Sequence, residues 1–126
     1  MIHLDTSVLV DALTGPRRSA AAMRAAIASG ERLAISTLVL YEWMRGPRTP
    51  AELDAQAQLL PQNEAVSFDA GAAARAASLY SQLRRPRGRE VDLAIAACAI
   101  LRDAKLWTLH REDFDDISGL DLYDAE

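Results

Sequence analysis

The stretch Met1–Ser7, MIHLDTS, raises the question on which the interpretation of this 126-residue chain depends. Residues 1–4 have the pattern of a buried strand, and this strand runs directly into Asp5. An unpaired carboxylate at the edge of a core is costly. Asp5 is therefore expected either to cap the helix that follows or to bind a cation.

The composition fits one domain over residues 1–126 that folds in a reducing compartment. Hydrophobic residues make up 50% of the chain, enough to bury one core. The single cysteine, Cys98, lies in the apolar run LAIAACAIL and is expected to be buried. The sequence shows no secretion signal and no apolar run of about 18 residues, so we expect a cytoplasmic protein that does not span a membrane.

The charge is unevenly distributed along the chain. The formal net charge is −4, and acids are concentrated in residues 112–126. Among the basic residues, Arg85, Arg87 and Arg89 lie in the segment RRPRGR. Arginine suits phosphate and carboxylate equally well. This segment is therefore either a loop that contacts the phosphates of a nucleic acid or a solvated loop.

Short apolar segments alternate with helical ones along the chain. Gly, Pro and capping residues separate them, and Ser7 is expected to cap the first helix. Strands that are apolar on both faces and separated by helices are typical of a parallel sheet covered on both sides. We therefore predict a single α/β domain with a mostly parallel, four- to five-stranded sheet. Its strands are expected at residues 2–4, 33–36, 64–68, 106–109 and, as a candidate fifth, 120–123. The helices are expected at residues 8–13, 17–30, 38–45, 49–60, 70–85 and 90–102.

Three acids interrupt apolar segments. Asp5 ends the first strand, Glu42 lies within LVLYEWM, and Asp92 lies in the first turn of a helix that is otherwise apolar. Ligands of a parallel sheet bind at the carboxyl ends of its strands. Right-handed crossovers bring helix starts to the same edge. We therefore expect these acids to meet there, together with an acid from residues 113–116.

Several carboxylates in one cleft repel each other, and a divalent cation removes that repulsion. Mg²⁺ and Mn²⁺ prefer oxygen ligands, and such an ion can activate a water for in-line attack on a phosphate. Each acid also has a purely structural explanation. Asp5 can cap a helix, Asp92 can complement the helix dipole, Glu42 can pair with Arg45, and the acids near Asp113 can be a solvated charge run.

Four segments in this order resemble the PIN domain, in particular the VapC-type toxins of bacterial toxin–antitoxin pairs. These segments are IHLDTSVLV, STLVLYEW, VDLAIAACA and LWTLHREDFDDISGLDLY, and together they span nearly the whole chain. The resemblance implies a Mg²⁺- or Mn²⁺-dependent endoribonuclease that cuts structured RNA such as tRNA or rRNA. It also implies a homodimer and a cognate VapB-like antitoxin that neutralises the toxin.

The resemblance assigns the catalytic acids to Asp5, Glu42, Asp92 and Asp113. It implies that Asp5 and Asp92 are the main metal ligands, that Glu42 positions a water or a second ion, and that Thr6 orients the Asp5 side. There is one departure from the family pattern, because His110 follows Thr108-Leu109 where the family usually has Asn or Asp. His110 either contacts phosphate and moves protons or is a surface residue at a strand end.

Two other interpretations remain. One is a receiver or an aspartyl-nucleophile phosphatase, which also uses acids at strand ends. The phosphatases need a second acid two residues after the first, and Ser7 occupies that place. The other is a catalytically weak PIN-like protein that acts by binding its partner, which His110 keeps open. Trp43 and Trp107 lie in apolar runs and are expected in the core rather than stacked on RNA bases.

Overall fold

The sheet is parallel, and its first strand lies at its centre. The computed structural model describes residues 1–125. Strand β1 (Ile2–Leu4) lies between β2 (Leu33–Ala34) and β3 (Lys105–Trp107), in the order β2-β1-β3. Ile2 is in register with Leu33 on one side and Lys105 on the other. The chain therefore leaves β1 and returns first on one side of it and later on the other.

The prediction of a parallel sheet flanked by helices is confirmed, but the strand count is wrong. Within residues 1–125 the sheet has three strands. The two remaining predicted strands form single parallel bridges, Ser36 with Val66 and Leu106 with Leu122. Val66 lies between the 3-10 turn η1 (Gln62–Glu64) and the helix α5 (Ala70–Gln82), which leaves a short extended stretch to pair.

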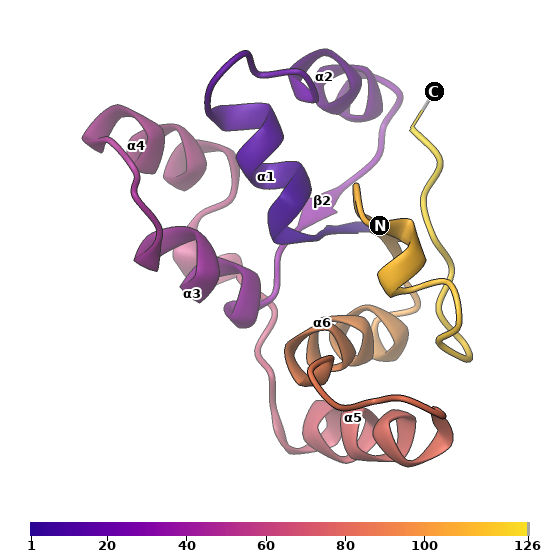
Figure 1. The fold of residues 1–126 in the computed structure, drawn as a ribbon. Helices are drawn as coiled ribbons and strands as arrows, with labels where there is room; N and C mark the ends of the chain where they lie inside the picture. Colours follow the sequence, from indigo (N-terminus) through magenta and orange to yellow (C-terminus); the bar gives the residue numbers. More distant parts are fainter. Residues whose placement is uncertain (126) are drawn as a thin grey trace.

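Helices surround the sheet in two groups. Helix α1 contacts α2, α3 and α4, whereas α5 packs along α6 (Figure 1). Two short 3-10 turns, η1 and η2, complete the described chain. The helices are α1 (Thr6–Leu13), α2 (Ala20–Ala28), α3 (Thr37–Arg45), α4 (Pro50–Leu59), α5 (Ala70–Gln82) and α6 (Glu90–Leu101), and the turns are η1 (Gln62–Glu64) and η2 (Arg111–Asp113).

Most of the helices begin where the sequence places a capping residue. The Ser36 hydroxyl accepts a hydrogen bond from the Val39 N–H, and Asp69 accepts one from Ala72. The prediction for Ser7 is wrong, because α1 begins at Thr6 and Asp5 occupies its N-cap position. Ser7 lies inside the first turn, where its hydroxyl is directed to Asp5 instead.

Helix α6 forms the centre of the core. All residues from Leu93 to Ala99 are buried, including Cys98, as expected for a helix that is apolar on every side. Trp43 and Trp107 are also buried, which confirms their placement in the core. A fully buried leucine or isoleucine side chain of this core contributes about 1.5–3 kcal/mol to folding. Within residues 1–125, no helix is both long and apolar enough to cross a membrane.

Candidate functional site

The candidate site lies at the carboxyl edge of the sheet, beside the central strand. Asp5 directly follows β1 and Thr108 directly follows β3. The Asp5 N–H donates a hydrogen bond to the Trp107 carbonyl over 2.9 Å, which joins the two strand ends. Because β1 has a neighbour on each side, its end is the switch point at which ligands of parallel sheets bind.

The Asp5 carboxylate is held by two hydroxyl groups. It is 6% exposed, and its Oδ2 accepts hydrogen bonds from Ser7 Oγ at 2.9 Å and Thr108 Oγ1 at 2.8 Å. Its side chain makes no capping hydrogen bond to α1. The capping explanation of Asp5 therefore fails. The two hydroxyls fix the carboxylate at the end of the strand.

Glu42 is directed toward the same edge by Thr6. The Thr6 hydroxyl donates a hydrogen bond to Glu42 Oε1 over 2.6 Å. Arg45 Nη2 lies 4.0 Å from Glu42 Oε2, at the limit of an ion pair, and its side chain is mostly exposed. Such a pair contributes little to stability. Thr6 thus orients Glu42, whereas the family resemblance implied that it orients the Asp5 side.

Asp5, Glu42 and Asp92 line one cavity of about 490 Å³. They come from three segments that lie far apart in the sequence: the end of β1, the middle of α3 and the first turn of α6. His110 lies at the same cavity. The other lining residues are Thr6, Ser7, Val10, Asp11, Thr14, Gly15, Pro16 and Leu109.

The burial and the mutual repulsion of the acids in this cavity change the pKa of Asp92. Burial, together with the charges of Asp5, Asp113 and Glu42, raises the pKa of Asp92 to about 6, and the charge of Arg89 opposes this shift. A carboxyl with this pKa is held in its charged form at neutral pH against the repulsion of its neighbours. A cation in the cavity would remove that repulsion.

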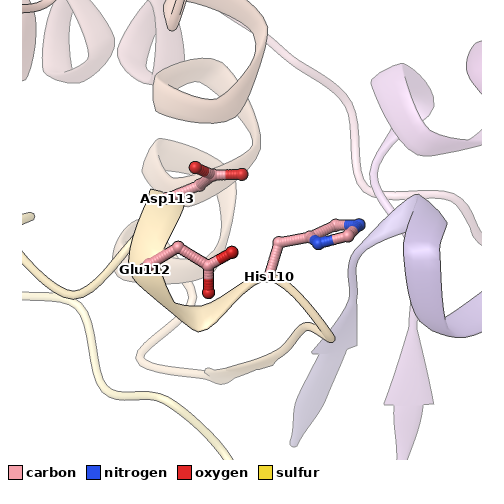
Figure 2. Close-up of side chains that lie close together, drawn as sticks. All are labelled: His110, Glu112 and Asp113. Atoms are coloured by element: carbon pink, nitrogen blue, oxygen red, sulfur yellow. The ribbon is translucent and has the colours of Figure 1, made fainter.

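The side chain of Asp113 does not line this cavity, although its charge acts on Asp92. It lines a neighbouring groove of about 630 Å³. One ligand atom each from His110, Glu112 and Asp113 lies within 4.8 Å of the other two (Figure 2). Among residues 1–125 this is the one set of three acidic, His or Cys side chains that is this close. Asp5, Glu42 and Asp92 therefore share a cavity without such close contact.

The residues present fit a hard divalent ion at the cavity. The donors that Asp5, Glu42 and Asp92 offer are carboxylate oxygens, which suit Mg²⁺ or Mn²⁺. Asp5 is rigidly placed, and its Oδ1 makes no hydrogen bond within the described chain. The repulsion that raises the pKa of Asp92 is a second sign that the set is arranged for a cation.

The arginines of RRPRGR are placed differently from one another. Arg84, Arg85 and Arg89 line the groove beside Asp113, whereas Arg87 is exposed and is not part of its lining. The Arg89 guanidinium binds both carboxylate oxygens of Asp116, at 2.9 and 2.6 Å. This contact raises the pKa of Arg89 and lowers that of Asp116. Some of the N–H donors of Arg89 are therefore already used by Asp116.

Sequence reasoning missed the residues that support the site. Thr108 and Ser7 hold Asp5, and Glu112 lies beside Asp113. A hydroxyl residue directly after a strand end was a usable signal for Thr108. The pairing of Arg89 with Asp116 spans 27 positions, and no local pattern indicates it.

Comparison with known proteins agrees with this geometry. The family model described as the PIN domain matches residues 2–120. One chain of VapBC2 from Rickettsia felis, solved bound to a DNA fragment, is 26% identical with a TM-score of 0.78, and the match covers 100% of both chains.

Two further solved structures are similar in fold. A chain of DNA-bound VapBC from Salmonella typhimurium is 19% identical with a TM-score of 0.80, covering 99% of this chain and 98% of that one. A chain of FitAcB from Neisseria gonorrhoeae is 19% identical with a TM-score of 0.74 and the same coverage. No curated protein has a significant match in sequence. The predicted resemblance to VapC-type PIN domains is confirmed, and the chain belongs to the PIN-domain family.

Proposed function

We propose that this chain is a divalent-metal-dependent endoribonuclease and the toxin of a toxin–antitoxin pair, acting on structured RNA such as tRNA or rRNA. The observation that carries the proposal is the cavity at the end of β1, which three acids from separate elements line. PIN domains are generally metal-dependent nucleases, and the solved structures similar to this chain are toxin–antitoxin complexes.

In this proposal Asp5 and Asp92 hold Mg²⁺ or Mn²⁺. The bound ion supplies Lewis-acid activation of the phosphate and of a water. Ser7 and Thr108 keep the Asp5 carboxylate in place, and Thr6 does the same for Glu42. Glu42 and Asp113 orient the attacking water. His110 lies at the rim, where its ring can contact a phosphate oxygen.

The RNA backbone enters along the groove beside the cavity. Arg84 and Arg85 are exposed there and offer guanidinium groups to phosphates. Arg87 lies on the same loop outside the groove, and Arg89 serves mainly to fix Asp116. The net charge of −4 does not oppose this, because four arginines are gathered in the segment RRPRGR.

We also propose a VapB-like antitoxin as partner, a homodimer as the assembly and the cytoplasm as the place of action. The antitoxin is proposed because the chain is similar to chains of the VapBC and FitAB complexes. The homodimer is proposed from the family resemblance, and the cytoplasm from the free, buried Cys98.

Cleavage of a mixed tRNA and rRNA sample in Mg²⁺ or Mn²⁺ tests this function. The parent should produce discrete fragments, and chelation should stop it. Asp5→Asn and Asp92→Asn should lose at least a hundredfold in rate while keeping the circular dichroism spectrum of the parent. Asp69→Asn is the matched control, since it makes the same chemical change at a helix cap, where Asn serves equally well. Equal cleavage by the parent and Asp5→Asn contradicts the proposal.

A second candidate function is a catalytically weak protein that acts through its antitoxin complex. His110 favours it, because this residue stands where the family usually has Asn or Asp. His110→Asn distinguishes the two. RNA cleavage by His110→Asn, with none by the parent, would support the second candidate, a catalytically weak protein.

A further inference from the structure

The loop between α1 and α2 forms one wall of the acidic cavity. Thr14, Gly15 and Pro16 line the cavity together with the acids. Arg17 and Arg18 follow them directly and are exposed. The loop lies at the end of α1 that is away from β1 (Figure 1). Because α1 has eight residues, the loop is about 12 Å along the helix from the end of β1.

Both ends of this loop are held by hydrogen bonds. The Thr14 hydroxyl donates to the Val10 carbonyl over 2.7 Å, and the Ser19 hydroxyl donates to Asp11 Oδ2 over 2.6 Å. Ser19 is buried, and Asp11 also lines the cavity. Between these ends, the Arg17 N–H donates to the Thr14 carbonyl over 3.1 Å. The loop is therefore a fixed part of the cavity wall.

Arg17 has a backbone conformation that is unfavourable for arginine. Its φ of 55° lies in the left-handed region, where the Cβ of an L-residue is crowded. Gly15 has a φ of 56° without this cost. Among residues 1–125, Asp103 is the one other non-glycine residue with a positive φ, and it follows the end of α6, where that conformation is common. A strained arginine beside a candidate site points to a function of its side chain.

The charges of Arg17 and Arg18 are not neutralised by neighbouring acids. Within residues 1–125 neither side chain forms a salt bridge, whereas Arg89 and Arg111 each bind a carboxylate. Guanidinium groups bind phosphate oxygens in pairs. The acids of the cavity repel a polyanion such as RNA, and two cations on the cavity wall offset that repulsion.

We propose that the α1–α2 loop binds the RNA backbone through Arg17 and Arg18, at a place separate from the groove that Arg84 and Arg85 line. This inference rests on the proposed RNA substrate. The loop is a helix length away from Asp5, so its arginines contact phosphates beside the scissile one. They are positioning residues, and their loss should weaken RNA binding rather than slow the chemical step.

Binding of tRNA in the Asp5→Asn background tests the charge of the loop. Replacing both Arg17 and Arg18 by Gln should lower the slope of log affinity against log salt by about 1–2, because each lost phosphate contact lowers it by a little under one. The control replaces Arg32 and Arg102 by Gln, two exposed arginines at the opposite edge of the sheet. Its slope should match that of the background. An unchanged slope in the loop variant overturns the proposal.

Arg17→Gly separates the side chain from the backbone conformation. Glycine accepts the left-handed region, so the thermal midpoint should be at or above that of the parent. The KM for RNA cleavage should rise by about fivefold, while kcat stays within about twofold of the parent. A purely structural role predicts the reverse. A lower midpoint with an unchanged KM would therefore overturn the proposal.

Failure of the loop contact and failure of the proposed nuclease give different results. If the parent cleaves RNA while the loop variants keep its KM and the slope of the background, the loop contact alone is wrong. If the parent cleaves no RNA but the slope for tRNA binding depends on Arg17 and Arg18, the loop contact is supported and the proposed cleavage is wrong.

Discussion

At the scale of single residues, the site depends on hydroxyl groups that fix carboxylates. Thr108 is the central one, because its side chain both donates to Asp5 and accepts from the His110 N–H. It therefore joins the predicted metal ligand Asp5 to His110, the residue before the η2 turn. Asp5 was predictable from its position after a strand, whereas the hydroxyls that hold it became visible only when distant segments were placed together.

Thr108→Val should destabilise the protein because it removes a hydroxyl that forms hydrogen bonds with two neighbouring groups. Asp5 loses one of its two donors and His110 loses the acceptor of its N–H. We expect the free energy of unfolding in urea to fall by about 1–3 kcal/mol. Thr108→Ser keeps the hydroxyl and is the control, with a loss of under about 1 kcal/mol. A valine variant as stable as the parent would show that the hydroxyl does not hold Asp5.

His3 gives a pH dependence that can be isolated by mutation. It is 1% exposed, and neither ring nitrogen has a partner. Burial, followed by the charges of Arg102 and the N-terminus, lowers its pKa from 6.5 to about 4. The unfolded chain therefore binds more protons between pH 6.5 and 4. The stability that His3 provides above pH 6.5 is lost as the pH falls through this window, by about 3 kcal/mol.

His3→Leu should remove this dependence and cost no hydrogen bond. The difference in unfolding free energy between parent and variant should shift in favour of the variant as the pH falls from 6.5 to 4. Comparing the two chains cancels the opposite contribution of Asp92, whose raised pKa favours the folded state in acid. A difference that stays constant over this range would show that His3 is not buried in its neutral form.

At the scale of elements, the helices follow from local signals and the edge strands do not. The start of α4 is an example, where Thr49 and Glu52 form a capping box and Pro50 is the first helical residue. The predicted strands at 64–68 and 120–123 have the apolar composition of strands. A strand also needs a neighbour in register and several consecutive extended residues that can pair with it. At Val66 and Leu122 each pairing lasts for one residue.

Thr49→Ala should destabilise α4 through the loss of its cap. The Thr49 hydroxyl accepts from the Glu52 N–H at 3.2 Å, and Glu52 accepts from the Thr49 N–H at 2.8 Å. We expect a loss of about 1 kcal/mol in thermal or urea unfolding. Thr49→Ser should retain most of the stability. Equal losses in both variants would indicate that the methyl group of Thr49, rather than its hydroxyl, is responsible.

At the scale of the whole molecule, the fold places an acidic cavity beside a groove that carries arginines. The sequence predicted that Asp5, Glu42 and Asp92 meet, because parallel topology brings strand ends and helix starts to one edge. It did not predict that Asp113 sits with His110 and Glu112, since that depends on the path of one 3-10 turn.

Replacing Arg84 and Arg85 by Gln should weaken RNA binding in proportion to the phosphates they contact. Measured with tRNA in the Asp5→Asn background, the slope of log affinity against log salt should fall by about 1–2. Arg24→Gln, an exposed arginine on α2 away from the groove, is the control for net charge. An unchanged slope in the double variant would place the RNA elsewhere.

The central claim is that the cavity acids are gathered for a cation, at a cost in stability without one. The most direct measurement is the unfolding free energy of the parent and of Asp92→Asn, with and without millimolar Mg²⁺. Without Mg²⁺ the variant should be more stable, because it removes the charge that Asp5, Asp113 and Glu42 repel. With Mg²⁺ the parent should gain stability and the variant should not. Equal responses of the two chains to Mg²⁺ would contradict the claim.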